Sequence, residues 1–320
     1  LRRLIILVVL FSIPAPLFCW GFFGHKKINR IAVFTLPTEL MGFYKDHIEF
    51  VTEHAVDPDM RRYVLPDEAP RHYIDIDHYG EKPFDLVPRN WYDAVEKFTE
   101  DTLQAYGIVP WHIDRVYRNL VYAFRKRDWP YVLKLSADLG HYIGDAHVPL
   151  HTTKNYNGQL TNQRGIHGFW ESRLPELYSE GYDYFTGTAR VIPTPLDDAW
   201  DAVEASHSAV DSVLMLEREL TERFPKDRKY AFDQRGASTV KTYSRDFSAE
   251  YHIMLNGMVE RRMRRSIIAV GSFWYSAWVE AGKPDLEAKE KINLEELEEE
   301  RKKLEAQKLS NEIKGREHDD

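Results

Sequence analysis

The sequence predicts an all-α protein, and three observations support this fold class. Apolar residues recur at helical spacing through most of the chain, whereas the alternating pattern of strands is scarce. Prolines stand at the ends of the apolar stripes, where helices begin and end. The chain of 320 residues is 43% hydrophobic and 13% aromatic, so it can bury the core of one large domain or two modest ones.

The N-terminal segment, residues 1–19, has the layout of a signal peptide. Two arginines precede an apolar run over residues 4–13, which is too short for a membrane-spanning helix of about 20 residues. We expect cleavage between Cys19 and Trp20, and therefore an exported protein, periplasmic or secreted. Lipid anchoring at Cys19 is the alternative, but Phe18 stands where such sites need a small residue.

Cys19 is the only cysteine, so the cleaved chain would contain none and could form no disulfide in an oxidising compartment. Bound metal is then a candidate stabiliser of the fold. The net charge of -8 gives no general basic footprint of the kind that proteins binding duplex DNA carry.

Two stretches show the helical pattern most clearly. An apolar stripe over residues 28–36 ends at Pro37, and a longer stripe predicts one long helix that opens near Pro195 and closes before Pro225. Loops are expected where Pro, Gly, Asn, Asp or Thr gather. These stretches are residues 57–59, 66–70, 80–88 and 152–165.

We expect a single multi-helix domain over residues 20–282, followed by a charged tail over residues 283–320. Glutamate and lysine dominate the tail, and only a thin apolar stripe runs through it. The tail is therefore predicted to be a solvated helix that becomes disordered over residues 315–320, with a coiled-coil contact as the alternative.

A histidine-rich segment in the middle of the chain carries the strongest chemical pattern. His141 and Asp145 are four residues apart, so on a helix they project from one face and can bind one ion together. A proline then ends the helix and lets His151 return on a loop. A second pair with the same spacing, His167 and Glu171, follows the next loop.

Upstream of this segment, Asp57 stands in a proline-containing turn, and His72 follows it along the chain. Each residue alone is weak evidence, because a single His–Asp pair on a helix is more often a surface hydrogen bond. Two such pairs around a further histidine, with no cysteine left for the site, favour a multinuclear metal centre of imidazole and carboxylate ligands.

The order of these residues resembles that of the zinc-dependent phospholipase C and P1 nuclease superfamily. The resemblance begins with the stretch Trp20–His25 and runs to about Glu171. The helices up to residue 282 would complete that fold. The resemblance therefore implies a hydrolase that depends on three zinc ions.

The resemblance also implies which residues hold each zinc ion. The first ion would be held by Asp57, His72, His141 and Asp145. The second would be held by His151, His167 and Glu171. The third would be held by the terminal amine and carbonyl of Trp20, by His25 and by Asp145, which then bridges two ions.

This arrangement suits phosphodiester hydrolysis. Two adjacent zinc ions lower the pKa of water toward about 7 and neutralise phosphate oxygens, while the third stabilises the leaving oxygen. Asp57 and Asp145 are the predicted catalytic carboxylates, since Asp57 would orient the attacking water and Asp145 would hold two cations together. The pattern also leaves His54, His78, His112 and His147 without a role.

Phospholipids and single-stranded nucleic acids are the two substrate classes that the resemblance allows. Tyr73 and Asp75 resemble the aromatic and acidic pair with which P1-type nucleases bind a base, although Tyr73 could equally pack in the core. Glu171, where the nucleases carry aspartate, and the lack of cysteines favour a phospholipase C-like enzyme. Phe23 and Pro58 argue against selectivity for choline head groups. A zinc-stabilised binding protein without catalysis is the third hypothesis.

Overall fold

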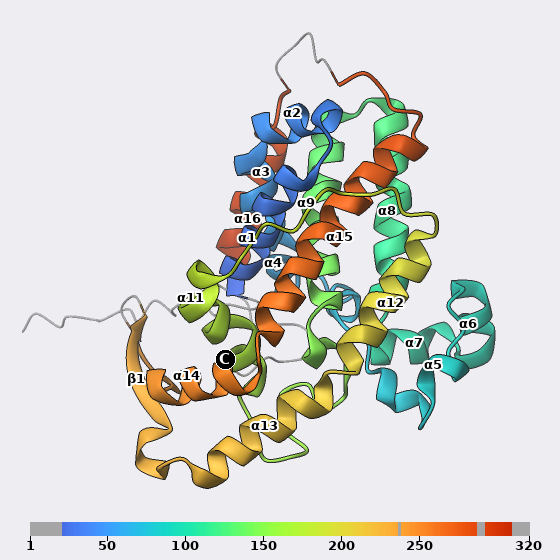
Figure 1. Ribbon diagram of the computed structural model, residues 1–320. Helices are drawn as coiled ribbons and strands as arrows, with labels where there is room; N and C mark the ends of the chain where they lie inside the picture. The colour runs from blue at the N-terminus through green and yellow to red at the C-terminus, as the bar shows by residue number, and fades with distance from the viewer. Residues whose placement is uncertain (1–20, 236–237, 287–291, 309–320) are drawn as a thin grey trace, which may run out of the picture.

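The computed structural model describes residues 21–235, 238–286 and 292–308. Within these ranges the chain is helical apart from one two-stranded hairpin, which confirms the predicted all-α fold as a single domain (Figure 1). The predicted signal peptide, Cys19 and Trp20 lie outside the described residues. No helix in the described ranges is long and apolar enough to cross a membrane.

Helix α9 (Trp129–Ala146) is the core element of the bundle. Asp128 caps its first turn by accepting a hydrogen bond from the backbone N–H of Tyr131 at 3.2 Å. Every residue from 135 to 150 is buried, so the predicted His–Asp pair lies in the interior. Four helices pack around α9: α1 (Gly21–Ala32), α3 (Ile48–Glu53), α8 (Val109–Lys126) and α15 (Met258–Glu280).

Two glycines of α9 let helix α1 approach closely. A Cβ atom at Gly140 would lie 2.0 Å from the side-chain oxygen of Asn29, and one at Gly144 would lie 3.0 Å from Nδ1 of His25. Asn29 is buried and donates hydrogen bonds to one backbone carbonyl of α3 and one of α9, both at 3.1 Å. The small residues of α9 therefore fix how near His25 comes to the rest of the site.

The stretch predicted as one long helix forms two helices, α12 (Pro195–His207) and α13 (Val210–Arg223). The break lets both helices pack against the short 3-10 turn Pro149–Thr152. There His207 Nδ1 donates to the carbonyl oxygen of Thr152 at 3.0 Å. The prediction is wrong at this point because neither proline nor glycine marks the break in the sequence.

The hairpin of β1 (Tyr230–Arg235) and β2 (Ser238–Tyr243) is an addition to the predicted fold. It leads into α14 (Arg245–Met254), and the ring of Tyr243 stacks on that of Phe169 with centroids 3.8 Å apart. The hairpin thus supports the segment after the polar loop and does not form a sheet domain of its own.

The remaining elements are short and connect the longer helices. The polar stretch over residues 153–165 contains neither helix nor strand, as predicted. The short α-helices are α2 (Thr38–Asp46), α4 (Asp57–Arg61), α5 (Pro83–Leu86), α6 (Trp91–Phe98), α7 (Glu100–Tyr106), α10 (Ile166–Gly168) and α11 (Leu174–Tyr178). A π-helical turn spans Phe169–Arg173, and 3-10 turns span Val33–Thr35, His54–Val56, Ala69–His72, Ile76–Tyr79, Ser179–Gly181 and Lys226–Arg228.

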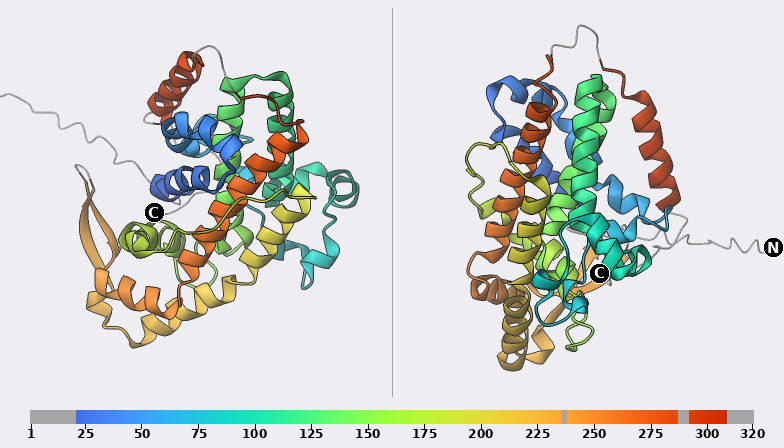
Figure 2. Two further views of the ribbon diagram at one scale, coloured as in Figure 1. Left: turned by 45° about the horizontal axis from the view of Figure 1, so that its top comes forward. Right: turned by 90° about the vertical axis from the view of Figure 1, so that its right-hand side faces the viewer.

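The charged tail contains helix α16 (Glu295–Lys308), which packs on α4 at the side of the bundle (Figure 2). Leu304 is 8% exposed and packs with Val56 and Met60. The predicted charged helix is therefore present as α16 and most of its residues are exposed, but one leucine of its thin apolar stripe is buried. Residues 315–320, predicted to be disordered, lie outside the described ranges.

Candidate metal centre

Asp145, near the C-terminal end of α9, lies in a buried group of side chains of the kind that bind metal. Its Oδ2 atom lies 3.2 Å from His141 Nε2, one turn earlier, and 3.0 Å from His72 Nδ1. The His141 and His72 nitrogens are themselves 3.0 Å apart. The helix thus brings the predicted pair together, and the turn that ends at His72 adds a second imidazole.

Asp59, and not the predicted Asp57, is the carboxylate beside these histidines. Asp59 Oδ1 lies 3.7 Å from His141 Nε2 and 3.8 Å from His72 Nδ1. Asp57 instead accepts a hydrogen bond from His54 Nδ1 at 2.6 Å. Both aspartates lie in α4, where residues two apart point about 200° away from each other, so only one can face the group. As a ligand of this group Asp57 is therefore replaced by Asp59, whereas the catalytic role expected for Asp57 stays a prediction.

His25 reaches this group from helix α1. Its Nε2 atom lies 3.4 Å from Asp145 Oδ1, and its ring stacks on that of His141 with centroids 3.9 Å apart. His25, His141 and Asp145 are close enough for their ligand atoms to hold one ion. Trp20, the other predicted ligand at this position, lies outside the described residues.

His151, His167 and Glu171 form a second buried group, as predicted. Glu171 Oε2 lies 3.1 Å from Nε2 of His151 and 3.1 Å from Nε2 of His167. The polar loop positions His167, because the side-chain oxygen of Asn157 accepts hydrogen bonds from the backbone N–H groups of Gly165 at 2.9 Å and His167 at 3.4 Å. The two groups adjoin, since His151 Nδ1 lies 3.7 Å from Asp145 Oδ1.

Backbone carbonyl groups fix the tautomers of three histidines. Nδ1 of His141 donates to Ala55 at 2.8 Å, Nδ1 of His151 to His72 at 2.6 Å, and Nδ1 of His167 to Tyr156 at 3.1 Å. When these rings are neutral, each Nε2 therefore presents a lone pair to the site. The Nε2 atoms of His151 and His167 lie only 3.2 Å apart, an arrangement that two lone pairs tolerate only with a cation between them.

The carboxylates of the site favour positive charge. Burial alone would lower the pKa of His141, but Asp145 and Asp59 raise it to about 9. Burial opposes ionisation of Asp145, yet His141 and His151 hold its pKa well below the usual range. In the same way His167 and His151 lower the pKa of Glu171 against the effect of burial. The site therefore keeps its acids ionised and attracts cations, be they protons or metal ions.

Asp59 gives a further indication that the site suits a cation. Its Oδ2 atom is buried and has no hydrogen-bond partner within the described residues. A buried carboxylate oxygen without a partner costs free energy that coordination to a cation would recover.

A layer of polar side chains packs against the histidines and holds them in place. The hydroxyl of Tyr142 donates to Glu68, which also accepts a hydrogen bond from Arg71 at 2.5 Å. Arg61 pairs with Asp138 at 3.0 Å. These charges balance one another inside the protein, so this layer holds the site in place and leaves no charge unmatched.

The predicted substrate-binding residues lie near the site but outside the ligand groups. Tyr73 directly follows His72, is 9% exposed and packs closely against Gly107, where an added Cβ atom would lie 2.6 Å from the tyrosine ring. Asp75 is half-buried, and its backbone N–H donates to the carbonyl of Tyr106 at 2.7 Å.

His54, His78, His112 and His147, which the sequence pattern leaves without a role, are outside these ligand groups. His54 pairs with Asp57, and His78 stacks on Tyr106 with ring centroids 3.3 Å apart. Burial lowers the pKa of His112 and of His147 to about 3, with help from nearby arginines.

Comparison with known proteins does not identify a function, so the functional proposal rests on the geometry of the site. No model of a known protein family matches the chain, and no curated protein matches it. Within the two ligand groups the structure contains three buried sets of His, Asp and Glu that could each hold a metal ion, because the group around Asp145 comprises two sets that share His141. This arrangement is compatible with a metal-dependent hydrolase.

Proposed function

We propose that the chain is a zinc-dependent phosphodiester hydrolase of the phospholipase C and P1 nuclease superfamily, with phospholipase C-like activity. The observation that carries the proposal is the pair of adjoining ligand groups around Asp145 and Glu171, in which imidazole lone pairs and ionised carboxylates converge in the interior. Metal sites for hydrolysis place two ions close together so that both can act on one phosphate.

The donor set supports zinc as the metal. Imidazole nitrogen and carboxylate oxygen are ligands that zinc accepts, and the described groups contain no sulfur. The Nε2 atoms of His141, His151 and His167 are oriented by carbonyl groups, as is usual for histidines that bind metal.

Zinc held here would polarise the phosphate and lower the pKa of water. Asp145 would hold the cations close together, because Oδ2 faces His72 and His141 while Oδ1 faces His25 and His151. Asp59, whose Oδ1 lies 3.7 Å from His141 Nε2 and 3.8 Å from His72 Nδ1, would take the role that the sequence suggested for Asp57 and orient the attacking water.

A phospholipid is the substrate that the surroundings favour. Tyr73, the residue expected to stack on a base, is 9% exposed and packs against Gly107, so little of its ring face is open to a nucleotide. This supports the phospholipase C-like activity over the nuclease activity.

The test compares cleavage of phosphatidylcholine and phosphatidylethanolamine vesicles with cleavage of single-stranded DNA and RNA, with zinc and with a strong chelator. We expect zinc-dependent release of phosphorylated head groups that exceeds nucleic-acid cleavage. Faster cleavage of DNA or RNA would assign the nuclease activity instead, and zinc binding without either reaction would support a non-catalytic zinc protein.

A matched pair of variants ties the activity to the site. Glu171→Gln removes a carboxylate that lies between two imidazoles, so activity should fall to background. Glu219→Gln changes an exposed glutamate of α13 in the same way and should leave activity unchanged.

A further inference from the structure

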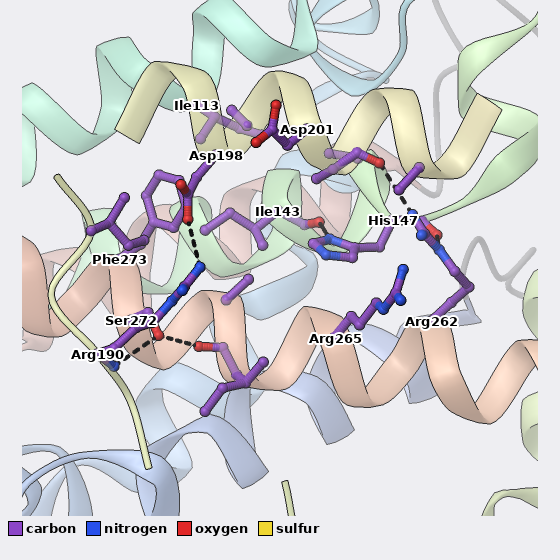
Figure 3. A pocket seen from close by; sticks show the side chains of 17 residues that line it. Ile113, Ile143, His147, Arg190, Asp198, Asp201, Arg262, Arg265, Ser272 and Phe273 are labelled. Carbon is purple, nitrogen blue, oxygen red and sulfur yellow. Dashed lines mark hydrogen bonds and ion pairs between the residues drawn. The ribbon is translucent and has the colours of Figure 1, made fainter. Parts of the chain in front are cut away.

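A cavity lies on the side of α9 that faces away from the ligand groups. It has a volume of about 340 Å³ and lies between α9, α12 and α15 (Figure 3). Ile143 of α9 and His147, which directly follows the helix, line it, whereas His141 and Asp145 project from the opposite side of α9. The cavity is therefore separate from the candidate metal centre.

Arg262 is a buried cation at one end of this cavity. Its side chain is 4% exposed, and it donates hydrogen bonds to the carbonyl of His147 at 2.8 Å and the carbonyl of Ala202 at 3.2 Å. It also donates to the hydroxyl of Ser206. All these acceptors are neutral, and Nη1 is buried without a hydrogen-bond partner among the described residues. Burial and the neighbouring Arg265 lower the pKa of Arg262 to about 9.

Arg265 lies beside Arg262 and adds a second positive charge. The two residues are three apart on α15 and share one face of the helix, and Figure 3 shows both next to His147. Arg265 is exposed at the edge of the cavity. Within the described ranges, neither arginine has a carboxylate within ion-pair distance.

The acidic residues of the cavity are already matched by other arginines. Asp198 lies 3.5 Å from Arg190, and Asp201 lies 3.0 Å from Arg89. The positive charges of Arg262 and Arg265 therefore stay uncompensated, which is costly for a buried guanidinium group unless an anion binds it.

The rest of the cavity is apolar. Isoleucine, alanine and phenylalanine side chains form most of its wall between the end with Arg262 and Arg265 and the end with Arg190. They are Ile113, Ile143, Ile192, Ala199, Ile268 and Phe273. A cavity of this size and lining suits a small ligand with an apolar body and few polar groups.

We propose that this cavity binds a small amphiphilic anion. Arg262 and Arg265 bind its anionic group through charge-assisted hydrogen bonds, and the isoleucine wall holds its apolar body. A carboxylate and a phosphate monoester both have this chemistry, and the geometry of two guanidinium groups accepts either.

The test measures binding of four six-carbon probes to the full zinc-loaded protein by calorimetry. The probes are hexanoate, hexyl phosphate, hexanesulfonate and the neutral hexanol. We expect the anions to bind about tenfold or more tightly than hexanol, because hydrogen bonds to charged groups are the stronger ones. The ratio between hexanoate and hexyl phosphate identifies the preferred anionic group.

Variants separate this cavity from the metal centre, which can also attract anions. Arg265→Gln, at an exposed position, should weaken hexanesulfonate binding about tenfold, and Arg262→Met should weaken it further. Arg218→Gln, an exposed arginine on α13, should have no effect. Asp145→Asn should leave hexanesulfonate binding intact.

Three results would overturn the proposal: equal binding of hexanol and the anions, unchanged binding in both Arg262 and Arg265 variants, or loss of hexanesulfonate binding in Asp145→Asn. The last result would place the anion at the metal centre.

Discussion

The two sides of α9 carry buried charge of opposite sign. On one side His141 and Asp145 meet further imidazoles and carboxylates, with two Nε2 atoms of the second group 3.2 Å apart. On the other side Ile143 and His147 line a cavity where Arg262 and Arg265 have no carboxylate partner in the described residues. One side therefore suits cations and the other suits an anion.

The polar layer around Arg61 shows what makes these two sides different from ordinary buried charge. Arg61 pairs with Asp138 at 3.0 Å, so its charge is balanced within the chain. Buried charges that balance one another stabilise or orient the fold, whereas those without a partner need a ligand. The sign of the missing charge then indicates the kind of ligand.

The largest effect is expected at Asp145. Asp145→Asn keeps the shape but removes the charge that faces both ligand groups, so zinc affinity and phosphodiesterase activity should each fall more than about a hundredfold, beyond the loss typical of supporting residues. Zinc content by plasma mass spectrometry and turnover of a chromogenic phosphodiester measure both. A fully metallated, active variant would show that the two ligand groups do not depend on Asp145.

The next effect separates two neighbouring aspartates. Asp59→Asn should lower zinc affinity about ten- to a hundredfold, because its carboxylate faces His72 and His141. Asp57→Asn changes a residue that bonds to His54 and should leave zinc content intact. Competition with a zinc-binding dye gives the affinities. The opposite order would restore the assignment made from sequence.

Much of the candidate metal centre can be predicted from the sequence, because helical spacing fixes which residues share a face. His141 with Asp145, and His167 with Glu171, need only the period of a helix to be paired. To choose between Asp57 and Asp59, one must know which residues of the five-residue helix α4 face the ligand groups. The sequence does not give this, because the same residues are equally compatible with a turn. The cavity with Arg262 and Arg265 is lined by residues of helices that are far apart in the sequence, so no local sequence pattern indicates it.

In the fold, too, some features can be predicted from the sequence and others depend on packing. The all-α class follows from apolar periodicity, but the break between α12 and α13 depends on packing against the turn that contains His151. Similarly, α16 is recognisable as a charged helix, whereas its contact with α4 depends on a single buried leucine, Leu304.

The third effect concerns how α1 reaches the metal side. Gly140→Ala places a methyl group 2.0 Å from Asn29, so we expect a loss of about 1–3 kcal/mol of stability and weaker zinc binding as His25 is displaced. Gly42→Ala is the control, since nothing lies within 4 Å of its added carbon in α2, and it should gain about 0.5–1 kcal/mol. Denaturant unfolding measures both changes. Equal effects of the two variants would contradict the close approach of α1 to α9.

The smallest effect is expected on the other side of α9. Ile143→Val removes one methyl group from the cavity wall and should cost about 0.5–1.5 kcal/mol of stability while zinc content stays the same. Unfolding curves and metal analysis of the same samples test this. A loss of zinc in this variant would mean that the two sides of α9 are not independent.

The most direct test of the candidate metal centre is the metal content of the full chain after purification and dialysis. We expect about three zinc ions per chain, and a chelator should remove them together with activity and roughly 4 kcal/mol of stability at a thousandfold excess of zinc over Kd. Restoring zinc should recover both. Fewer than about two tightly bound ions, or unfolding curves that do not change with chelator, would contradict a multinuclear zinc site.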